Sequence, residues 1–237
     1  MSDPLLTVPR RFCGPPSSGN GGWSAGALAA HVDAPVVSVS LFAPPPLDTP
    51  MPIGVEDDAR VASHDGAAVL RADPAAGDLA VVAWVPPAEA RAAEAAYAGL
   101  TSHPFPTCFS CGTARDRGDG LRIFPGRVAD QEGSARVAAT WTPDASVADV
   151  LPATTWAALD CVGGWAGDLE ERLMVLARMT ARVDRLPEVG AEHVVVGLGR
   201  RTEGRKTFTA SALYDADGEL LGSAEHLWIA VDPAAFA

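Results

Sequence analysis

The chain has 237 residues, and 48% of them are apolar, which is enough for one large domain or two small domains with their own cores. Its net charge of −12 at pH 7 argues against nucleic acid and anionic membrane surfaces as partners. No apolar run reaches the ~18 residues of a membrane-spanning helix, and the N-terminal segment lacks a signal-peptide pattern. With four cysteines and no such signal, we expect a cytoplasmic protein with reduced thiols.

The first distinctive stretch is GPPSSGNGGWSAGALAAH at residues 14–31. It begins as a loop of Gly, Pro and Ser and then passes into a run of small residues. Residues 19–22 read Gly-Asn-Gly-Gly, and Asn20 is a residue type that commonly caps a helix. The composition predicts a helix that begins here and carries few long side chains.

A series of β-strands is predicted to follow. The run 36–43 is β-branched and apolar, and a proline-rich break ends it. Two apolar runs within residues 59–72 flank Asp65-Gly66, a dipeptide typical of hairpin turns. The apolar run 78–87 is expected to be the last strand of this half of the chain.

The middle of the chain is predicted to contain a helix, a loop and two further strands. Residues 87–99 begin with proline and end with glycine, the usual asymmetry of a helix. Residues 102–120 are rich in Pro, Gly and polar side chains and are predicted to form a linker-like loop. Strands are expected again at 121–128 and 135–143.

A second stretch of small residues, LPATTWAALDCVGGWAG at residues 151–167, is predicted to form another helix. It differs from the first because it carries one acid, Asp160. Apolar and β-branched runs then predict strands at 172–187, 193–201 and 206–233.

The two halves of the chain show the same order of features. Each has a small-residue helix, a long apolar strand, a proline-marked break and one Asp-Gly turn, at Asp65 and at Asp217. Each is expected to end on a Trp-bearing strand that stops at proline, after Trp84 and after Trp228. The order predicts two copies of one α+β unit, in which an antiparallel sheet wraps an apolar helix.

In these features the chain resembles the hotdog-fold acyl-CoA thioesterases, in which a curled antiparallel sheet wraps one central helix. The repeated order is similar to that of the double-hotdog branch, with one unit over residues 1–100 and a second over 101–237. The run CFSCGTARDRGDGLRIF at residues 108–124 is also similar to the start of many phenylacetate-type hotdog thioesterases. The resemblance covers nearly the whole chain. It implies hydrolysis of an acyl thioester with no cofactor, since coenzyme A is part of the substrate.

The resemblance also implies a mechanism. A backbone N–H at the start of one central helix polarises the thioester carbonyl, and a carboxylate on the helix of the other unit attacks it or activates a water. These roles agree with elementary physics, because a helix N-terminus offers unpaired N–H groups and the positive end of a dipole. Glycine at that end allows a substrate oxygen to approach closely, as an oxyanion hole requires.

Each half of the chain has what the other lacks. The first half offers Asn20, Gly21 and Gly22 at a helix entry but has alanine, at Ala27 or Ala29, where the acid is expected. The second half offers Asp160 but has no glycine at its helix entry. We therefore expect one composite site between the halves and one inactive counterpart.

Asp160 stands among small and apolar neighbours such as Trp156 and Leu159. An acid is rarely buried without a partner or a function, and burial should raise its pKa. The alternative is a helix acid that pairs with a neighbour. Thr155 is included in the site as a group that could position water, although helix capping by Thr154 and Thr155 is the simpler interpretation.

His103, Cys108 and Cys111 have the spacing of half a zinc site. A complete site needs more ligands, and Cys13 and Cys161 are the remaining thiols. An isolated pair of cysteines is weak evidence, so the sequence favours small buried thiols at a turn, and no metal is expected. A nucleophilic role for Cys161 is disfavoured because no histidine base lies near it in the sequence.

Basic residues gather within residues 178–206 and could bind the phosphates of coenzyme A. The residues chosen for this role are Arg178, Arg182, Arg200 and Arg201. For each of them, an exposed position on a strand is the alternative. Two other function classes stay open: a non-catalytic module that binds acyl thioesters or lipids, and a scaffold stapled by zinc. The expected partner is a small acyl-CoA, and a homodimer is considered because hotdog pairs often assemble further.

Overall fold

The computed structural model describes residues 4–232 and residue 234. Its α-helices are α1 (Gly21–Ala29), α2 (Pro87–Ala93) and α3 (Leu151–Ala166). Its strands are β1 (Leu5–Leu6), β2 (Val36–Leu41), β3 (Met51–Glu56), β4 (Ala59–His64), β5 (Ala67–Pro74), β6 (Gly126–Gln131), β7 (Ser134–Trp141), β8 (Met174–Val183), β9 (His193–Glu203), β10 (Lys206–Asp215) and β11 (Leu220–Ala230). Within the described residues, no helix is long and apolar enough to cross a membrane.

All eleven strands belong to one sheet in the order β1-β3-β4-β5-β2-β8-β11-β10-β9-β7-β6. Every neighbouring pair is antiparallel, as predicted. Strands from the first half of the chain occupy one end of the sheet and strands from the second half the other. The two groups join where β2 pairs with β8, from Val36 opposite Arg182 to Ser40 opposite Arg178.

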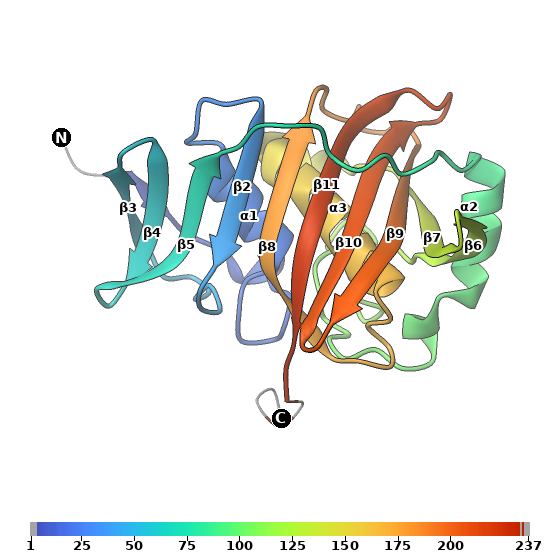
Figure 1. Cartoon of the computed structure of the whole chain (residues 1–237), viewed down its shortest axis with the longest axis horizontal. Helices are drawn as coiled ribbons and strands as arrows, with labels where there is room; N and C mark the ends of the chain where they lie inside the picture. The colour runs from blue at the N-terminus through green and yellow to red at the C-terminus, as the bar shows by residue number, and fades with distance from the viewer. Residues whose placement is uncertain (1–3, 233, 235–237) are drawn as a thin grey trace.

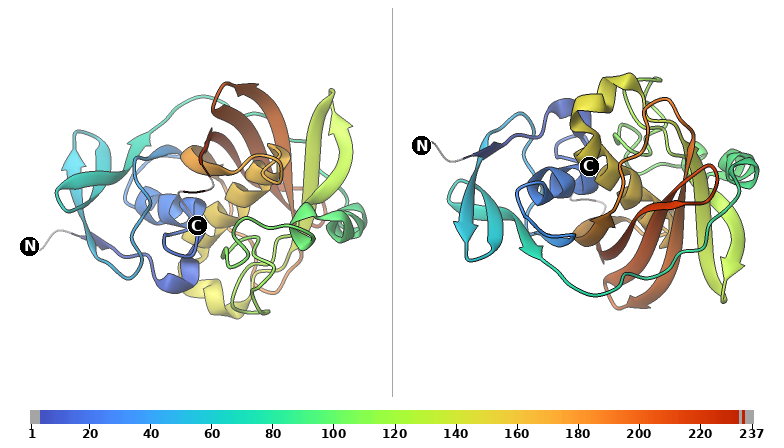
Figure 2. Two further views of the ribbon diagram at one scale, coloured as in Figure 1. Left: turned by 90° about the horizontal axis from the view of Figure 1, so that it is seen from below. Right: turned by 90° about the horizontal axis from the view of Figure 1, so that it is seen from above.

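Helices α1 and α3 lie side by side against one face of this sheet, and the sheet curves around them (Figures 1 and 2). Helix α1 contacts β2, β5 and β8, while α3 contacts β9, β10 and β11. Residues 153–166 of α3 are all buried, so this helix has no solvent-facing side. A helix buried on every face needs the apolar composition that its sequence has.

The scarcity of long side chains in α1 and α3 allows the two helices to touch. A Cβ atom at Gly26 would lie 2.7 Å from both Cβ and Cγ of Trp156 and 2.9 Å from Cα of Ala153. A Cβ atom at Gly22 would lie 2.7 Å from the carbonyl oxygen of Trp156. Real Cβ atoms do not come this close to other atoms, so the packing of the helices requires glycine at both positions.

Residues 78–87 do not form the predicted strand, and this part of the prediction is wrong. The segment crosses the outer face of the second half of the sheet and leads into α2 (Figure 1). Its apolar side chains Val82 and Val85 are buried. Two of its N–H groups donate hydrogen bonds to side chains rather than to the backbone of a neighbouring strand. Ala80 N donates to Glu225 at 3.2 Å and Ala83 N to Gln131 at 2.8 Å.

After this crossing, the residues up to 100 contact the strands of the second half of the chain rather than those of the first half. Helix α2 contacts β6 and β7, and Ala90 joins a cluster with Val194 and Val196 of β9. Residues 80–100 therefore pack on the second half of the sheet, and by packing the first half ends with β5 rather than at residue 100.

Several smaller predictions can be compared with the structure. The Asp65-Gly66 turn joins β4 to β5 with φ angles of 49° and 76°, which is the left-handed conformation that this dipeptide favours. The predicted helix over 87–99 ends earlier, at Ala93, and continues as 3₁₀ turns. The strand predicted at 121–128 begins only at Gly126.

His226 provides a prediction about acid stability. It is buried on β11 with Nδ1 3.2 Å from the hydroxyl of Thr209, and burial lowers its pKa to about 4. As the pH falls, the imidazole of His226 is therefore protonated in the unfolded chain before it is protonated in the folded protein. The stabilisation present above pH 6.5 is lost as the pH falls toward 4. We expect the unfolding free energy of the wild type to drop by about 3 kcal/mol relative to His226→Gln between pH 7 and pH 4.

Urea titrations of both proteins across this range measure that difference, and contributions from all other groups cancel in it. His31→Gln provides the matched substitution at an exposed histidine. Parallel curves for wild type and His226→Gln would show that the His226 imidazole is not held neutral.

Candidate active site

The N-terminus of α1 is capped in the way the sequence predicts. Asn20 has extended backbone angles, and its side-chain oxygen accepts a hydrogen bond from Trp23 N at 2.8 Å. The indole of Trp23 stacks on Phe12 with 4.3 Å between ring centroids, which fixes the first turn of the helix. The N–H of Gly21 has no acceptor within the part of the chain that the structure describes. The helix therefore begins with an unused hydrogen-bond donor.

Asp160 of α3 lies directly against this helix end. Gly22 N donates a hydrogen bond to Asp160 Oδ2 at 2.8 Å, across 138 residues of sequence. The other carboxylate oxygen, Oδ1, has no hydrogen-bond partner among the described residues. The glycines of the first stretch and the acid of the second thus meet, with one carboxylate oxygen bound and one unbound.

Burial determines the protonation chemistry of Asp160. The residue is only 2% exposed, and the loss of solvent raises its pKa to about 8. The hydrogen bond from Gly22 opposes this shift, and the neighbouring Cys108 adds to it. The carboxylate is consequently a stronger base than an exposed aspartate, as its apolar neighbours in the sequence predict.

A cavity of about 260 Å³ opens beside Asp160 and the start of α1. Gly21, Asn20 and Asp160 form part of its wall, and most of the remaining lining is apolar. Phe42 is part of the lining and is 61% exposed, so it marks the entrance. The other lining residues are Gly14, Pro15, Ser18, Gly19, Leu41, Ala43, Pro44, Pro45, His103, Phe105, Cys108, Cys111, Cys161, Leu169, Met174, Val175, Leu176, Ala177, Trp228 and Ile229.

The prolines of segment 41–45 indicate only a break after a strand, and no sequence signal assigns this segment to the site. In the structure this segment lines the cavity, and its Pro45 accepts a hydrogen bond from Gly19 N at 2.8 Å. The contact ties the two loops together beside the start of α1. No local pattern in the sequence signals such a contact between loops.

Three cysteines also reach the cavity wall: Cys108, Cys111 and Cys161. Asn20 Nδ2 lies 3.7 Å from the sulfurs of Cys108 and Cys161, so the capping residue also contacts this group. Hydrogen bonds from the thiols of Cys111 and Cys161 lower the pKa of Cys108. Cys161 is buried, as expected for a core thiol, and the fold places its sulfur 3.6 Å from that of Cys108.

Thr155 does not take part in the site. Its hydroxyl donates to the carbonyl oxygen of Leu151 at 2.8 Å, within its own helix, and the side chain does not line the cavity. The capping alternative is also wrong, because α3 begins at Leu151 and the residue before it, Val150, gives no side-chain cap. Thr154 and Thr155 lie in the second turn, where they cannot cap the helix.

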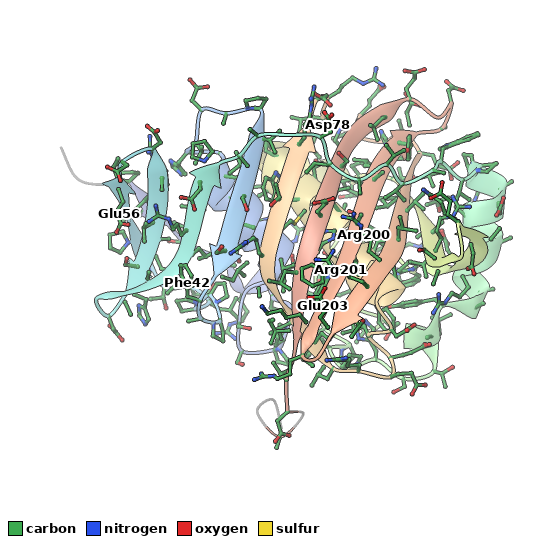
Figure 3. The ribbon with its side chains drawn as sticks, in the orientation of Figure 1. Phe42, Glu56, Asp78, Arg200, Arg201 and Glu203 are labelled. Carbon is green, nitrogen blue, oxygen red and sulfur yellow. The ribbon has the colours of Figure 1, made fainter. Side chains whose placement is uncertain are left out.

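The four arginines chosen for phosphate binding do not line the cavity. Arg182 pairs with Asp184, Arg200 with Glu225 and Arg201 with Glu203, at 2.7, 2.6 and 2.7 Å. Figure 3 shows Arg200, Arg201 and Glu203 together on the sheet, well separated from Phe42 at the entrance.

Arg178 differs from the other three arginines. Its side chain bonds to the hydroxyl of Ser40 at 3.1 Å, and it follows the cavity-lining residue Ala177. Among the four, Arg178 is therefore the arginine whose neighbour in the chain lines the cavity.

The opposite ends of the two helices form no equivalent site. Trp156 lies on Gly26 there, and α1 contains no acid to face the start of α3. A smaller hollow of about 230 Å³ at that end is lined by Pro152, Trp156, Val183, Asp184, Arg185 and Leu186. The donor and the acid therefore come together at one end of the helix pair.

The close approach at Gly22 leads to a prediction about stability. In Gly22→Ala the new methyl group would meet the Trp156 carbonyl and the Asp160 side chain, neither of which can move without separating the helices. We expect a loss of about 1–3 kcal/mol in unfolding free energy, measured by urea denaturation. Gly54→Ala is the control, because its methyl group would have no atom nearer than 4.0 Å. Equal stabilities of the two variants would contradict this account of helix packing.

No protein-family model and no curated protein sequence matches the chain. Solved structures do match. The tesB protein of Mycobacterium avium subspecies paratuberculosis is 12% identical with a TM-score of 0.59, over 96% of this chain and 91% of that chain. Acyl-CoA thioesterase II TesB2 of Mycobacterium marinum is 11% identical with a TM-score of 0.58, over 98% and 93% of the two chains.

A conserved protein of unknown function with a hotdog fold from Alicyclobacillus acidocaldarius is 14% identical with a TM-score of 0.56, over 97% of this chain and 93% of that chain. At such identities a likeness establishes the fold alone. By its curved antiparallel sheet, its enclosed helices and this likeness over most of the chain, the protein has a hotdog fold similar to that of these solved structures.

Proposed function

We propose that this protein hydrolyses an acyl thioester of coenzyme A at a single site between α1 and α3. The observation that carries the proposal is the 2.8 Å hydrogen bond from Gly22 N to Asp160 Oδ2 at the wall of an apolar cavity. It joins a carboxylate to a helix N-terminus, the two groups that thioester hydrolysis needs.

The start of α1 supplies the electrophilic side of the reaction. The Gly21 N–H, which has no acceptor in the described part of the chain, donates to the thioester carbonyl oxygen, and the helix dipole adds a positive potential there. Both interactions strengthen as the oxygen becomes negative during attack. Gly21 has no side chain to block the approach of the carbonyl.

Asp160 supplies the base. Its unbound oxygen Oδ1 takes a proton from a water molecule while that water attacks the carbonyl carbon. The tetrahedral intermediate collapses with cleavage of the carbon–sulfur bond, and the proton returns from Asp160 to the departing sulfur. The products are a carboxylic acid and the free thiol of coenzyme A. Gly22 holds the other oxygen, so the base keeps one orientation throughout.

The arrangement supports a double hotdog in which each half contributes one component. In this interpretation α1 with β1–β5 and α3 with β6–β11 are two fused units. The first provides the N–H donors and the second provides the acid, while the opposite ends of the helices form the inactive counterpart. The apolar lining suits the acyl group, and Arg178 is the arginine placed to meet the polar part of coenzyme A outside the entrance. The four free cysteines agree with a cytoplasmic location, where thiols stay reduced.

The competing function is a binding module that holds an acyl thioester without hydrolysing it. A panel of acyl-CoAs with short, long, branched and aromatic acyl groups separates the two. Released coenzyme A is quantified by chromatography, so the protein's own thiols do not interfere. Turnover of at least one substrate above the uncatalysed rate supports the proposal. Binding measured by calorimetry with no turnover of any substrate would favour the module.

A further inference from the structure

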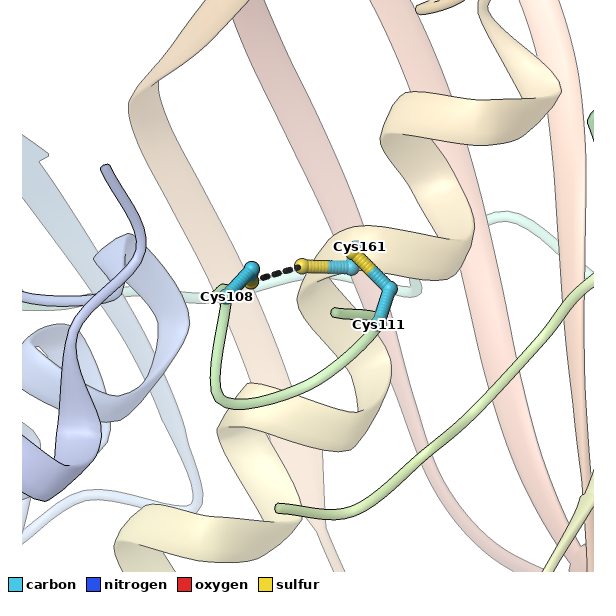
Figure 4. A group of neighbouring side chains, drawn as sticks. All are labelled: Cys108, Cys111 and Cys161. Carbon is cyan, nitrogen blue, oxygen red and sulfur yellow. Dashed lines mark hydrogen bonds between the residues drawn. The ribbon is translucent and has the colours of Figure 1, made fainter. Parts of the chain in front are cut away.

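Three cysteines from two separate parts of the chain converge at the cavity wall. Cys108 and Cys111 lie on the loop before β6, and Cys161 lies on α3 directly after Asp160. Their three sulfur atoms lie within 4.8 Å of one another, and the Cys108 and Cys161 sulfurs are 3.6 Å apart (Figure 4). All three residues are buried, and each is a free thiol.

The turn that carries Cys108 and Cys111 is held firmly in place. Gly112 N donates to the Cys108 carbonyl at 2.9 Å, and a Cβ atom at Gly112 would lie 2.7 Å from Cys108 N. The carbonyl oxygen of Cys111 accepts a hydrogen bond from the hydroxyl of Tyr97 at 3.1 Å. On the other side of the turn, Phe109 N donates to the Cys13 carbonyl at 2.8 Å. These contacts hold the backbone of the turn in place, and with it the point from which each cysteine side chain extends.

The spacing of the sulfurs fits a metal ion. Zinc–thiolate bonds are about 2.3 Å long, which in a tetrahedron puts the sulfurs about 3.8 Å apart. One pair is already at 3.6 Å and no pair exceeds 4.8 Å, so small side-chain rotations close the triangle.

One polar side chain contacts the sulfurs, and the cavity borders the triangle that they form. Asn20 directs its side-chain N–H group toward Cys108 and Cys161, both at 3.7 Å, and such outer contacts orient and stabilise thiolate ligands. His103 does not complete the set, because its ring nitrogens engage Phe105 N at 3.0 Å and the Cys111 carbonyl at 3.1 Å. The cavity borders all three cysteines, so the remaining coordination position faces the cavity.

We infer that Cys108, Cys111 and Cys161 form a binding site for a soft divalent cation of the zinc class, with three thiolate ligands and a fourth position open to the acyl cavity. Binding forms three metal–sulfur bonds, and the protons that the thiols carry are released to solvent, without any oxidation. The fourth position takes a water or a ligand atom that enters the cavity. The sequence predicts no metal here because Cys161 is remote from the pair in the chain, and the fold supplies it as the third ligand.

The test measures binding of Zn²⁺ itself, independently of hydrolysis. Protein stripped with a chelator under reducing conditions is titrated with Zn²⁺ against a chromophoric competitor, and bound metal is quantified after gel filtration. We expect about one equivalent per chain, with release of thiol protons into weak buffer as the ion binds. Substitution by Co²⁺ should add the near-ultraviolet absorption of thiolate-to-cobalt charge transfer.

Cys13 provides the matched control, because it is the fourth buried cysteine and lies outside the cluster, with its thiol bonded to Thr107 O at 3.3 Å. Cys13→Ser should bind Zn²⁺ like the wild type, whereas Cys161→Ala should bind at least about 10-fold more weakly and lose the cobalt absorption. Circular dichroism shows whether each variant is folded. The inference is overturned if folded wild type retains no stoichiometric Zn²⁺, or if Cys161→Ala binds the ion as tightly as the wild type. The wild-type stoichiometry and the cobalt absorption decide the matter even if a variant fails to fold.

Discussion

Asp160→Asn is expected to reduce acyl-CoA hydrolysis by about 10²- to 10⁴-fold, the usual contribution of a general base. The amide oxygen can still accept the Gly22 N–H bond, so the helix contact and the shape of the cavity should persist. The amide cannot take a proton from water, and the loss should therefore appear in kcat. Affinity for a non-hydrolysable thioether analogue, measured by calorimetry, should stay near the wild-type value.

Asp168→Asn is the matched control for this substitution. Asp168 follows the C-terminus of the same helix, is exposed, and makes a surface ion pair with Arg127. Its φ of 64° is one that asparagine also adopts, and loss of an exposed ion pair has little effect on stability. This variant should retain full activity. Hydrolysis by Asp160→Asn at the wild-type rate would exclude Asp160 as the base.

Gly21→Pro is expected to lower kcat by about 10²- to 10³-fold, the usual effect of losing one oxyanion donor. Proline is well tolerated at the first position of a helix, and it requires an extended residue before it. Asn20 already has φ −60° and ψ 130°, so the fold should accept the change. The substitution removes the N–H that has no acceptor in the described chain and fills the space beside it.

Gly21→Ala separates loss of the donor from loss of space. It keeps the N–H, and its methyl group would lie 2.9 Å from Cδ2 and 3.0 Å from Cβ of Leu176, which are side-chain rather than backbone atoms. We expect the alanine variant to remain much more active than the proline variant, with similar thermal unfolding of both. If the two variants lose kcat equally while remaining folded, steric exclusion explains the effect and the role of the Gly21 N–H is refuted.

Local sequence signals identify many elements of the fold correctly. The Asp65-Gly66 dipeptide forms the turn between β4 and β5 because both residues adopt positive φ without large strain. The small-residue stretches 14–31 and 151–167 contain α1 and α3, and their composition reflects burial against the sheet and against each other. These features depend on neighbours in the chain, which a sequence displays directly.

The sequence predictions that the structure contradicts share a different cause. Residues 78–87 have the apolar composition of a strand, but side chains of Glu225 and Gln131 take their N–H groups. Thr155 has the residue type of a cap but lies inside the helix. Arg200 is paired with Glu225, an acid 25 residues further along the chain that the fold places beside it. In each case the partner of a polar group decides its role, and composition does not reveal partners.

The sequence by itself determines that this chain builds two apolar helices and a set of antiparallel strands. It also indicates a site through the glycines at the start of one helix and the single acid, Asp160, within the other. Only the tertiary structure brings Gly22 to Asp160 across 138 residues and Cys108 to Cys161 across 53. The physical reason is that helix and turn propensities act over a few neighbouring residues, whereas these contacts depend on how closely α1, α3 and the cysteine loop pack. That packing is set by shape at glycine positions such as Gly22 and Gly26, where one added carbon atom would separate the helices.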